Sequence, residues 1–280
     1  MKNHYTILTS LLFISFTIPI ETKISIPKLP PRVSSFFSRN KDETIHKEFN
    51  NIKKLEIFCE HGNVSIETWR QPCVLVEFKK QGSDLFLQDA YVKYIDKDST
   101  LQVTTQLKEN AVSGTISLHI LVPETLPVKV ETTQGDIIIT GLSGTIEAQT
   151  TNKSITVLQG TGTVIASTTE GNIFVQRRAI QQNSCLNLQS LHGDITVSIP
   201  QDLHCEVQAQ SPYGKIYSEL FVTLHPQTIL LNDETFKKLK HYIHGSIGQS
   251  MQDKNEAMMI LSSDDGIIKI IPYNSKKIKR

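Results

Sequence analysis

This sequence of 280 residues contains few tryptophans, cysteines and aromatic residues, with one Trp, four Cys and 7% aromatic residues in all. Its 29 Lys and Arg are balanced by 28 Asp and Glu, which gives a net charge of +1. Nucleic-acid binders usually carry an excess of basic charge, so this balance argues against that class of partner. The small number of aromatic residues argues against the large pocket of a cofactor enzyme. Glycine (14) and proline (11) are too few for a collagen or a low-complexity chain.

Familiar motifs for catalysis and cofactor binding are also missing. No C-x-x-C pair is present, which argues against zinc ribbons and thioredoxin-like redox sites. Gly160-Thr161-Gly162 lacks the third glycine of a dinucleotide-binding loop. The residues around Ser246 do not have the G-x-S-x-G spacing of a nucleophile elbow. We therefore predict no catalytic, cofactor-binding or metal-binding residues, and no cofactor.

The N-terminal residues have the pattern of an export signal. The stretch from Tyr5 to Ile20 contains no charged residue, and it is short for a membrane-spanning helix of roughly 20 residues. It fits the apolar region of a signal peptide, although no A-x-A-like cleavage site follows. We assign residues 1–22 to a signal peptide or an uncleaved N-terminal anchor, and both interpretations predict export. Residues 23–47, with three prolines, are predicted to be a linker.

An internal repeat organises the rest of the chain. When the sequence is aligned on a turn residue, the positions seven and five before it and two and four after it are apolar in 27 of 28 cases, with Ser218 as the exception. The interleaved positions are apolar in only 7 of 28 cases. The seven aligned turn residues are Gly62, Gly135, Lys153, Gly171, Gly193, Gly214 and Gly266. Glycine is expected there because it supplies a positive φ or a tight bend at little cost.

This period of two predicts β-strands with one buried face and one exposed face. From Gly135 to Gly214 the turn residues follow one another at intervals of 18, 18, 22 and 21 residues, about one solenoid rung each. We predict an all-β fold, a β-solenoid or single-stranded β-helix-like stack of repeats of about 20 residues. A β-sandwich is the alternative.

Longer insertions at both ends of the repeat region are predicted to cap the stack. The N-terminal insertion contains four further strand patterns, at 73–78, 91–95, 101–106 and 115–122. In the C-terminal insertion, Asp233 could begin a short helix with Phe236, Leu239, Tyr242 and Ile243 on one face, ended by Gly245. Residues 274–280 form a basic tail.

A family resemblance rests on the repeat motifs. The run SLHILVPETLPVKVETTQGDIIITGLSGTIEAQT continues through STTEGNIFV and SLHGDITVSIP, and the closing parts are Gly245-Ser246-Ile247-Gly248 and Ser263-Asp264-Asp265-Gly266-Ile267-Ile268. Over Phe49 to Tyr273 the chain resembles the bacterial DUF4097 family of adhesin-like domains. We therefore describe residues 48–273 as a β-repeat, adhesin-like domain. The resemblance implies a role in adhesion or in the cell envelope and carries no catalytic residues.

The four cysteines permit disulfides in an exported chain. Cys59 and Cys73 flank two adjacent predicted strands and could pair, but free, partly buried thiols are favoured. By the alternation Cys185 faces outward and Cys205 inward, which makes a bridge between them awkward.

Other polar residues have stronger structural explanations than chemical ones. His241 and His244 could share a metal on the predicted helix, but no third ligand is visible, so a solvated face is favoured. Glu131, Glu147 and Asp194 lie on the outward row and would be the carboxylates of a polysaccharide-active enzyme.

We predict an exported, non-enzymatic β-repeat protein of the cell envelope, found in the periplasm, in the envelope or outside the cell. Its role would be adhesion, scaffolding or binding, and its partner an unknown protein or glycan at the cell surface, with self-association as a further option. Membrane contact would occur only through an uncleaved N-terminal segment. A polysaccharide-active β-helix enzyme and a membrane-anchored regulatory or sensor domain are the alternatives.

Overall fold

A computed structural model describes residues 44–107, 114–179, 181, 183–225, 241–248 and 257–273. These residues belong to one compact unit, Lys41–Arg280. The predicted leader (1–22), most of the predicted linker (23–47) and the basic tail (274–280) lie outside the described residues. The first strand, β1 (Thr44–Phe49), begins four residues before the predicted domain boundary at 48, because it pairs with a later strand. No helix among the described residues is long and apolar enough to cross a membrane.

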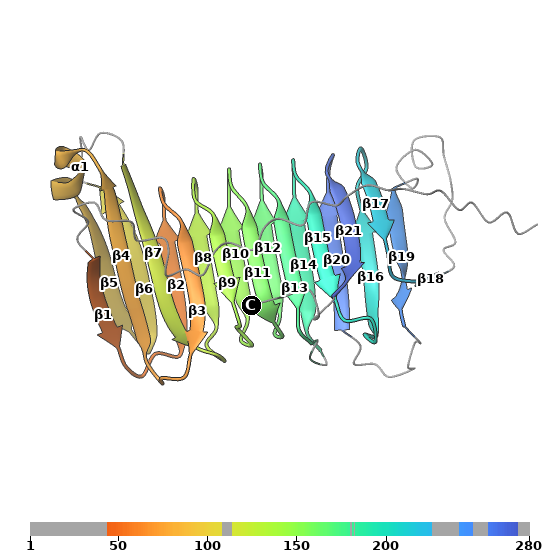
Figure 1. Cartoon of the computed structure of the whole chain (residues 1–280), viewed down its shortest axis with the longest axis horizontal. Helices are drawn as coiled ribbons and strands as arrows, with labels where there is room; N and C mark the ends of the chain where they lie inside the picture. The colour runs from red at the N-terminus through yellow and green to blue at the C-terminus, as the bar shows by residue number, and fades with distance from the viewer. Residues whose placement is uncertain are drawn as a thin grey trace, which may run out of the picture. The chain divides into compact units, whose positions relative to one another are not determined.

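Each of the seven predicted units forms one rung, and each rung gives one strand to each of two sheets (Figure 1). The turn residue of the unit connects the two strands. The rungs are β2 (Lys54–Cys59) with β3 (Val64–Trp69), β8 (Val128–Thr132) with β9 (Ile137–Thr140), β10 (Ile146–Thr150) with β11 (Ile155–Gly160), β12 (Val164–Thr168) with β13 (Ile173–Arg177), β14 (Cys185–Ser190) with β15 (Ile195–Ile199), β16 (Cys205–Gln210) with β17 (Lys215–Ser218), and β20 (Ala257–Ser263) with β21 (Ile267–Pro272).

Neighbouring rungs pair in parallel and in register. Ile155 pairs with Ile137 on one side and with Ile173 on the other, and Ile173 pairs with Ile195. The side chains of these four isoleucines are at most 1% exposed. Burying each contributes roughly 1.5–3 kcal/mol before the entropy cost of ordering the chain. Of the 27 apolar repeat positions only Ile216 is not buried, because β17 lies at the edge of its sheet.

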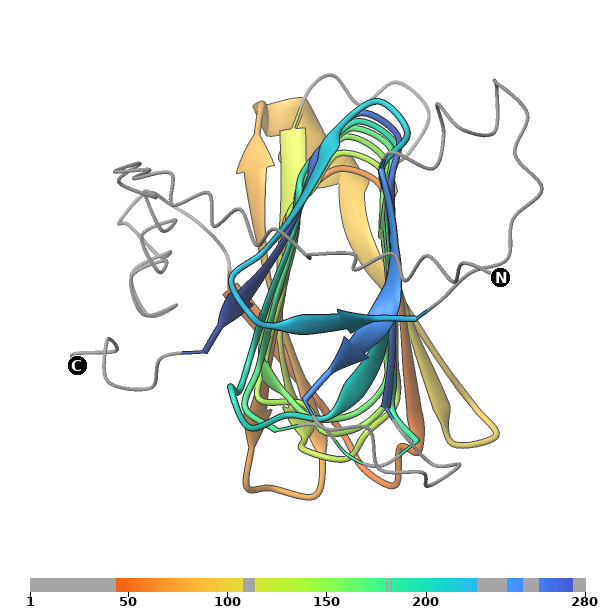
Figure 2. The same cartoon turned by 90° about the vertical axis from the view of Figure 1, so that its right-hand side faces the viewer.

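The solenoid prediction is therefore confirmed, with two sheets rather than a single-stranded coil. The chain passes from one sheet to the other at every turn residue, and the rungs superimpose when viewed along the stack (Figure 2). In the described part of the chain one sheet has ten strands, in the order β1-β4-β7-β3-β9-β11-β13-β15-β21-β17. The other has eleven, in the order β18-β19-β16-β20-β14-β12-β10-β8-β2-β6-β5.

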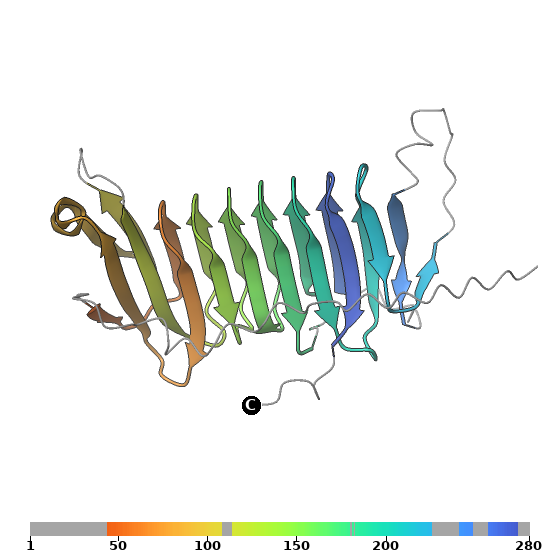
Figure 3. The same cartoon turned by 45° about the horizontal axis from the view of Figure 1, so that its top comes forward.

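The rungs do not all stack in sequence order, although the regular intervals between the turn residues led us to expect that they would. The rung of β20 and β21 lies between the rung of β14 and β15 and the rung of β16 and β17 (Figure 3). Ile268 consequently pairs with Ile195 on one side and with Ile216 on the other. The last rung of the sequence is thus an inner rung of the structure.

The two insertions lie at the ends of the stack, as predicted, and the outermost strands there pair antiparallel. The N-terminal insertion supplies β4 (Val74–Gly82), α1 (Asp84–Asp89), β5 (Ala90–Lys97), β6 (Thr100–Leu107) and β7 (Gly114–Pro123). All four predicted strand patterns of this insertion are confirmed. At the other end β18 (Val222–Leu224) and β19 (Tyr242–Ile247) extend the eleven-stranded sheet beyond β16.

The predicted helix is wrong over its C-terminal part. Tyr242 and Ile243 belong to strand β19, which pairs antiparallel with β16. This ladder satisfies the backbone hydrogen bonds of β19, and it outweighs the weak helical pattern. The other residues of the predicted helix, Asp233, Phe236 and Leu239, lie outside the described residues.

The turn glycines allow backbone to approach backbone between rungs. A Cβ atom on Gly171 would overlap the carbonyl oxygen of Lys153, and a Cβ on Gly193 would overlap that of Gly171. The same holds for the other turn glycines, whose neighbours are Ile116 for Gly62, Gly62 for Gly135, Gly266 for Gly214 and Gly193 for Gly266. Among these six, Gly62 alone also has a positive φ (148°). Close stacking, more than a left-handed bend, therefore explains the glycine column.

Most rungs carry a hydroxyl side chain three residues before the turn residue, and this column of hydroxyl groups reinforces the stacking. Thr168 Oγ1 donates to the carbonyl of Lys153 at 3.1 Å, and Ser190 Oγ donates to that of Gly171 at 2.9 Å. Thr150, Ser211 and Ser263 make the equivalent bond to Gly135, Gly266 and Gly193. The hydroxyls lie on the inner face of the strands, where the carbonyls would otherwise lack a donor.

Replacing Gly171 with alanine is expected to lower the free energy of unfolding by about 1–3 kcal/mol, because the new methyl group forces two rungs apart. Gly160→Ala is the matched control, since its Cβ would meet Leu142 and Val157 at 3.4 Å, an ordinary contact. We expect the control to change the free energy of unfolding by no more than about 1 kcal/mol. Urea denaturation followed by circular dichroism measures both, and equal effects would contradict the stacking explanation.

Replacing Thr168 with valine is expected to lower the free energy of unfolding by about 1 kcal/mol, because one hydrogen bond between rungs is lost. Thr132 occupies the same column, but among the described residues its hydroxyl has no hydrogen-bond partner. Thr132→Val should therefore leave the melting temperature unchanged or raise it. A loss of the same size in both variants would show that the hydroxyl column does not stabilise the stack.

Candidate binding groove

A row of polar side chains crosses the outer face of the eleven-stranded sheet. Parallel, in-register pairing places Phe58 opposite Glu131, and Glu131 opposite Gln149. On the other side of Phe58 lies Thr104. Because side chains alternate along each strand, all four residues face away from the core. The row continues with Ser167 and Gln189 on the next two strands.

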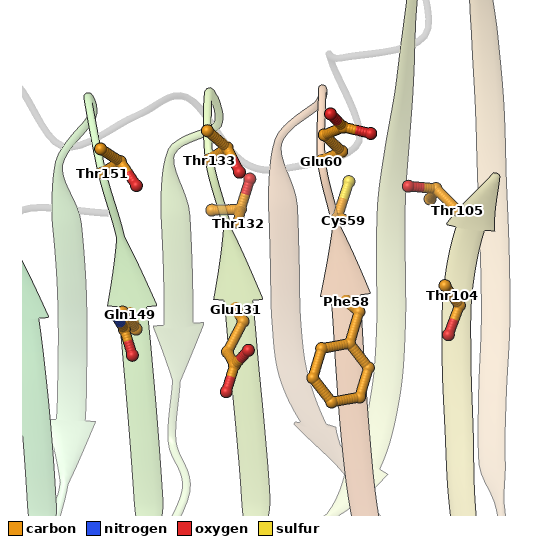
Figure 4. Close-up of a pocket in the computed structure, with 10 residues that line it drawn as sticks. All are labelled: Phe58, Cys59, Glu60, Thr104, Thr105, Glu131, Thr132, Thr133, Gln149 and Thr151. Atoms are coloured by element: carbon orange, nitrogen blue, oxygen red, sulfur yellow. The ribbon is translucent and has the colours of Figure 1, made fainter. Parts of the chain in front are cut away.

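A groove of about 360 Å³ opens at the N-terminal end of this row. The pairing of β2 with β6 ends at Phe58 and Thr104, whereas its pairing with β8 continues to Cys59 and Thr132. Strands β2 and β6 thus separate beyond Phe58 and Thr104, and the groove lies between them (Figure 4). Its lining residues are Phe58, Cys59, Glu60, Thr104, Thr105, Glu131, Thr132, Thr133, Gln149 and Thr151.

Thr132 distinguishes this groove from the other rungs. The residue is 7% exposed, and its buried hydroxyl makes no hydrogen bond to a described residue. In the rungs of Thr150 and Thr168 the equivalent hydroxyl is bonded to a carbonyl of the preceding rung. A buried hydroxyl without a partner has a cost in stability, so this rung is less well satisfied than its neighbours.

Charged groups on the sheet face form a network beside the groove. Lys129 Nζ lies 2.8 Å from Glu131 Oε1, and this carboxylate, followed by the charges of Glu147 and Glu56, raises the pKa of Lys129. Hydrogen bonds from Lys54 and then Gln102 lower the pKa of Glu56. The Lys129 ammonium is also 6.0 Å from the centre of the Phe58 ring. The face therefore presents a positive charge held between carboxylates.

Cys59 at the bottom of the groove is not an activated nucleophile. Burial raises the pKa of its thiol to about 11, so the reactive thiolate is rare at neutral pH. The sulfur lies 3.4 Å from the carbonyl oxygen of Ile116 and 3.5 Å from that of Gly62.

Cys59 and Cys73 carry free thiols, so the possible bridge between them is not formed. Cys59 ends β2 next to the glycine turn, whereas Cys73 precedes β4 at the opposite edge, where its carbonyl accepts the indole N–H of Trp69. The length of β3 separates the two positions. Cys185 is partly exposed and Cys205 is buried, as the alternation predicted.

The three carboxylates considered for an enzyme do not come together. Glu131 and Glu147 lie on adjacent strands, two positions apart in register. Asp194 lies three rungs from Glu131, in the turn between β14 and β15. Its Oδ1 atom accepts the backbone N–H of Ile267 at 2.8 Å, so it holds two rungs together.

His241 and His244 do not share a helix face. The carbonyl of His241 accepts the backbone N–H of Ser211, whereas His244 lies on β19 beside His225 and Glu206. Strand pairing thus brings His225 and Glu206 to His244, and the spacing of His241 and His244 on a predicted helix could not reveal this group.

The sequence interpretation missed the hydroxyl column, although a signal was present. Three residues before each turn residue stand Cys59, Thr132, Thr150, Thr168, Ser190, Ser211 and Ser263. A column of small hydroxyl residues with one thiol on an otherwise apolar face indicates a shared hydrogen-bonding role. Only the structure shows that the hydroxyl of Thr132 differs from the others.

Comparison with known proteins agrees with this architecture. No curated protein matches the chain. Among solved structures, the chain is similar to a candidate cell adhesion protein from Clostridium sporogenes, with 14% identity, 83% of this chain and 100% of the other covered, and a TM-score of 0.52. A candidate adhesin from Bacteroides fragilis shows 14% identity over 83% of this chain and 98% of the other, with a TM-score of 0.45.

A family model described as Toastrack DUF4097 matches residues 2–229, which include the first six rungs in sequence order. The repeat motifs and the two-sheet stack agree with that match. The chain therefore belongs to the DUF4097 family.

Proposed function

We propose that this protein is an exported, non-enzymatic, adhesin-like protein of the cell envelope that binds a glycan in the groove beside Phe58. The observation that carries the proposal is the groove of about 360 Å³ on the outer face, which is lined by an aromatic ring, carboxylates, an amide and threonines. The similar fold of the candidate cell adhesion protein from Clostridium sporogenes supports the adhesive part of the proposal.

The side chains of the groove suit a ligand that is rich in hydroxyl groups. The Phe58 ring offers an apolar surface for the C–H face of a sugar. Glu131 and Glu60 accept hydrogen bonds from sugar hydroxyls, whereas Gln149 and Thr104 can donate to them. A few polar groups around one apolar surface are the usual composition of a small-molecule site.

The polar row allows a longer ligand to extend out of the groove. Neighbouring strands are about 4.7–4.9 Å apart, so Gln149, Ser167 and Gln189 offer one polar contact at each step. A rigid stack holds these contacts in fixed positions, and a bound chain would not have to order them. A linear glycan lying across the strands fits this arrangement.

Binding without turnover agrees with the state of the carboxylates. Glycoside hydrolysis needs two carboxyl groups on opposite sides of one bond, at a separation of about 5–9.5 Å. Here Asp194 serves the backbone of a neighbouring rung, and Glu131 is paired with Lys129. We therefore assign these residues to structure and binding.

The function can be tested by applying the full chain to an array of neutral and acidic glycans. We expect binding to at least one glycan, without cleavage of it. Phe58→Ala and Gln149→Ala should weaken that binding at least about tenfold, which corresponds to 1.4 kcal/mol. Gln149→Ala is informative because Gln149 is exposed, so the stability of this variant is expected to be that of the wild type.

Gln189→Ala is the matched control, since Gln189 lies on the same outer row two strands beyond Gln149. It should bind the short glycans of the array as well as the wild type does. Binding that is absent in the wild type, or reduced equally by Gln189→Ala and Gln149→Ala, would overturn the groove as the site.

A further inference from the structure

Three side chains with metal-binding groups meet at the C-terminal cap of the eleven-stranded sheet. In the antiparallel ladder of β16 and β19, Gln208 pairs with His244 and Glu206 pairs with Ser246. His225 directly follows β18, and its backbone N–H donates to the carbonyl of His244 at 3.0 Å. Glu206, His225 and His244 therefore come from three neighbouring strand segments and face the same side of the sheet.

The ligand atoms of these side chains converge. His244 Nε2 lies 3.6 Å from Glu206 Oε2, and His225 Nε2 lies 4.0 Å from Glu206 Oε1. All three ligand atoms are within 4.8 Å of one another, and the two imidazole centroids are 5.1 Å apart. In the described part of the chain this is the one group of three His, Cys, Asp or Glu side chains with that property.

These separations fit the coordination sphere of a small cation. An atom placed centrally among donors 3.6–4.8 Å apart lies about 2.1–2.8 Å from each of them. Zinc prefers about 2.0–2.2 Å to imidazole nitrogen and carboxylate oxygen, so shifts of a few tenths of an ångström complete the site. Two imidazoles and one carboxylate suit Zn²⁺ and related transition metals better than Mg²⁺ or Ca²⁺, which prefer oxygen.

The surroundings hold the ligands in place and leave one side open. The side chains of His225 and Glu206 are each 33% exposed, and that of His244 is 26% exposed. Solvent can thus reach the centre of the group and supply a water as the fourth ligand. The buried Ser246 hydroxyl lies 3.3 Å from His225 Nε2, and this nitrogen would exchange that contact for the metal.

We propose that Glu206, His225 and His244 bind one divalent transition metal, with Zn²⁺ the best match, and that the metal fastens β18 and β19 to β16. The edge of a sheet is where a stack of rungs frays or pairs with other chains, and β18 is the last strand at this edge. A metal held by three strand segments would close this end. The proposal does not depend on the glycan groove, which lies at the other end of the sheet.

The test is a titration of ZnCl₂ into the chelator-treated full chain, followed by isothermal calorimetry. We expect one tight equivalent of Zn²⁺ per chain and a higher melting temperature with the metal, which EDTA reverses. Glu206→Gln, His225→Ala and His244→Ala should each weaken binding at least about 10- to 100-fold and abolish the shift in melting temperature. Co²⁺ bound to the wild type should show the visible absorption of a site with nitrogen ligands.

His192→Ala is the control, since His192 is another partly exposed histidine that faces a carboxylate, that of Asp265, at 3.0 Å. It should bind Zn²⁺ like the wild type. Circular dichroism spectra without metal show whether each variant is folded, and Glu206→Gln keeps the shape of the side chain. The proposal is overturned if the wild type takes up no Zn²⁺, or if the three variants bind it as tightly as the wild type.

Discussion

The close approach of backbone to backbone at the turn between the two sheets is the constraint on which the structure depends. At each turn glycine the neighbouring rung leaves no room for a side chain. Hydroxyl groups then bond the turn carbonyls, as Thr168 and Ser190 do. Side-chain oxygens in the next position add a third set of bonds, in which Asn172 accepts the N–H of Asp194. These bonds fix the register of every strand that follows, and the apolar rows pack as a consequence.

Because the inner rows and the turns stabilise the fold, residues on the outer faces of the sheets can take part in binding. Stability comes from the inner rows and the turns, so outward residues such as Gln149 and Gln189 have no packing role. A binding site can then arise wherever the regular pairing is interrupted. The groove lies where β6 leaves β2, and the His–Glu cluster lies where the parallel stack changes to antiparallel strands.

The sequence was sufficient to predict the strands, their facing and the stacking of Ile137, Ile155 and Ile173, because alternation and repeat spacing are both local patterns. It was not sufficient for the order of the rungs. The interval of 21 residues between Gly193 and Gly214 is typical of adjacent rungs, yet the rung of Gly266 lies between them. A five-residue connection such as 200–204 can span one strand spacing or two. The length of the connection therefore does not show whether two successive rungs are neighbours or are separated by a third rung.

Buried polar residues and tertiary clusters were also beyond the sequence. Arg177 is charged and would be expected in water, but it is fully buried, and burial lowers its pKa to about 10. Its guanidinium donates to the carbonyls of Thr161 and Gly162, and the repeat pattern does not reveal these contacts. Likewise Glu206, His225 and His244 are far apart in the chain and meet only through the antiparallel ladder of the cap.

The insertion of the last rung is the part of the architecture that can be measured most directly. Nuclear Overhauser effects between backbone protons report which strands are neighbours in a sheet. The structure predicts contacts of the strand of Ile268 with both the strand of Ile195 and the strand of Ile216. Direct contacts between the strands of Ile195 and Ile216, with Ile268 at the outside, would contradict it.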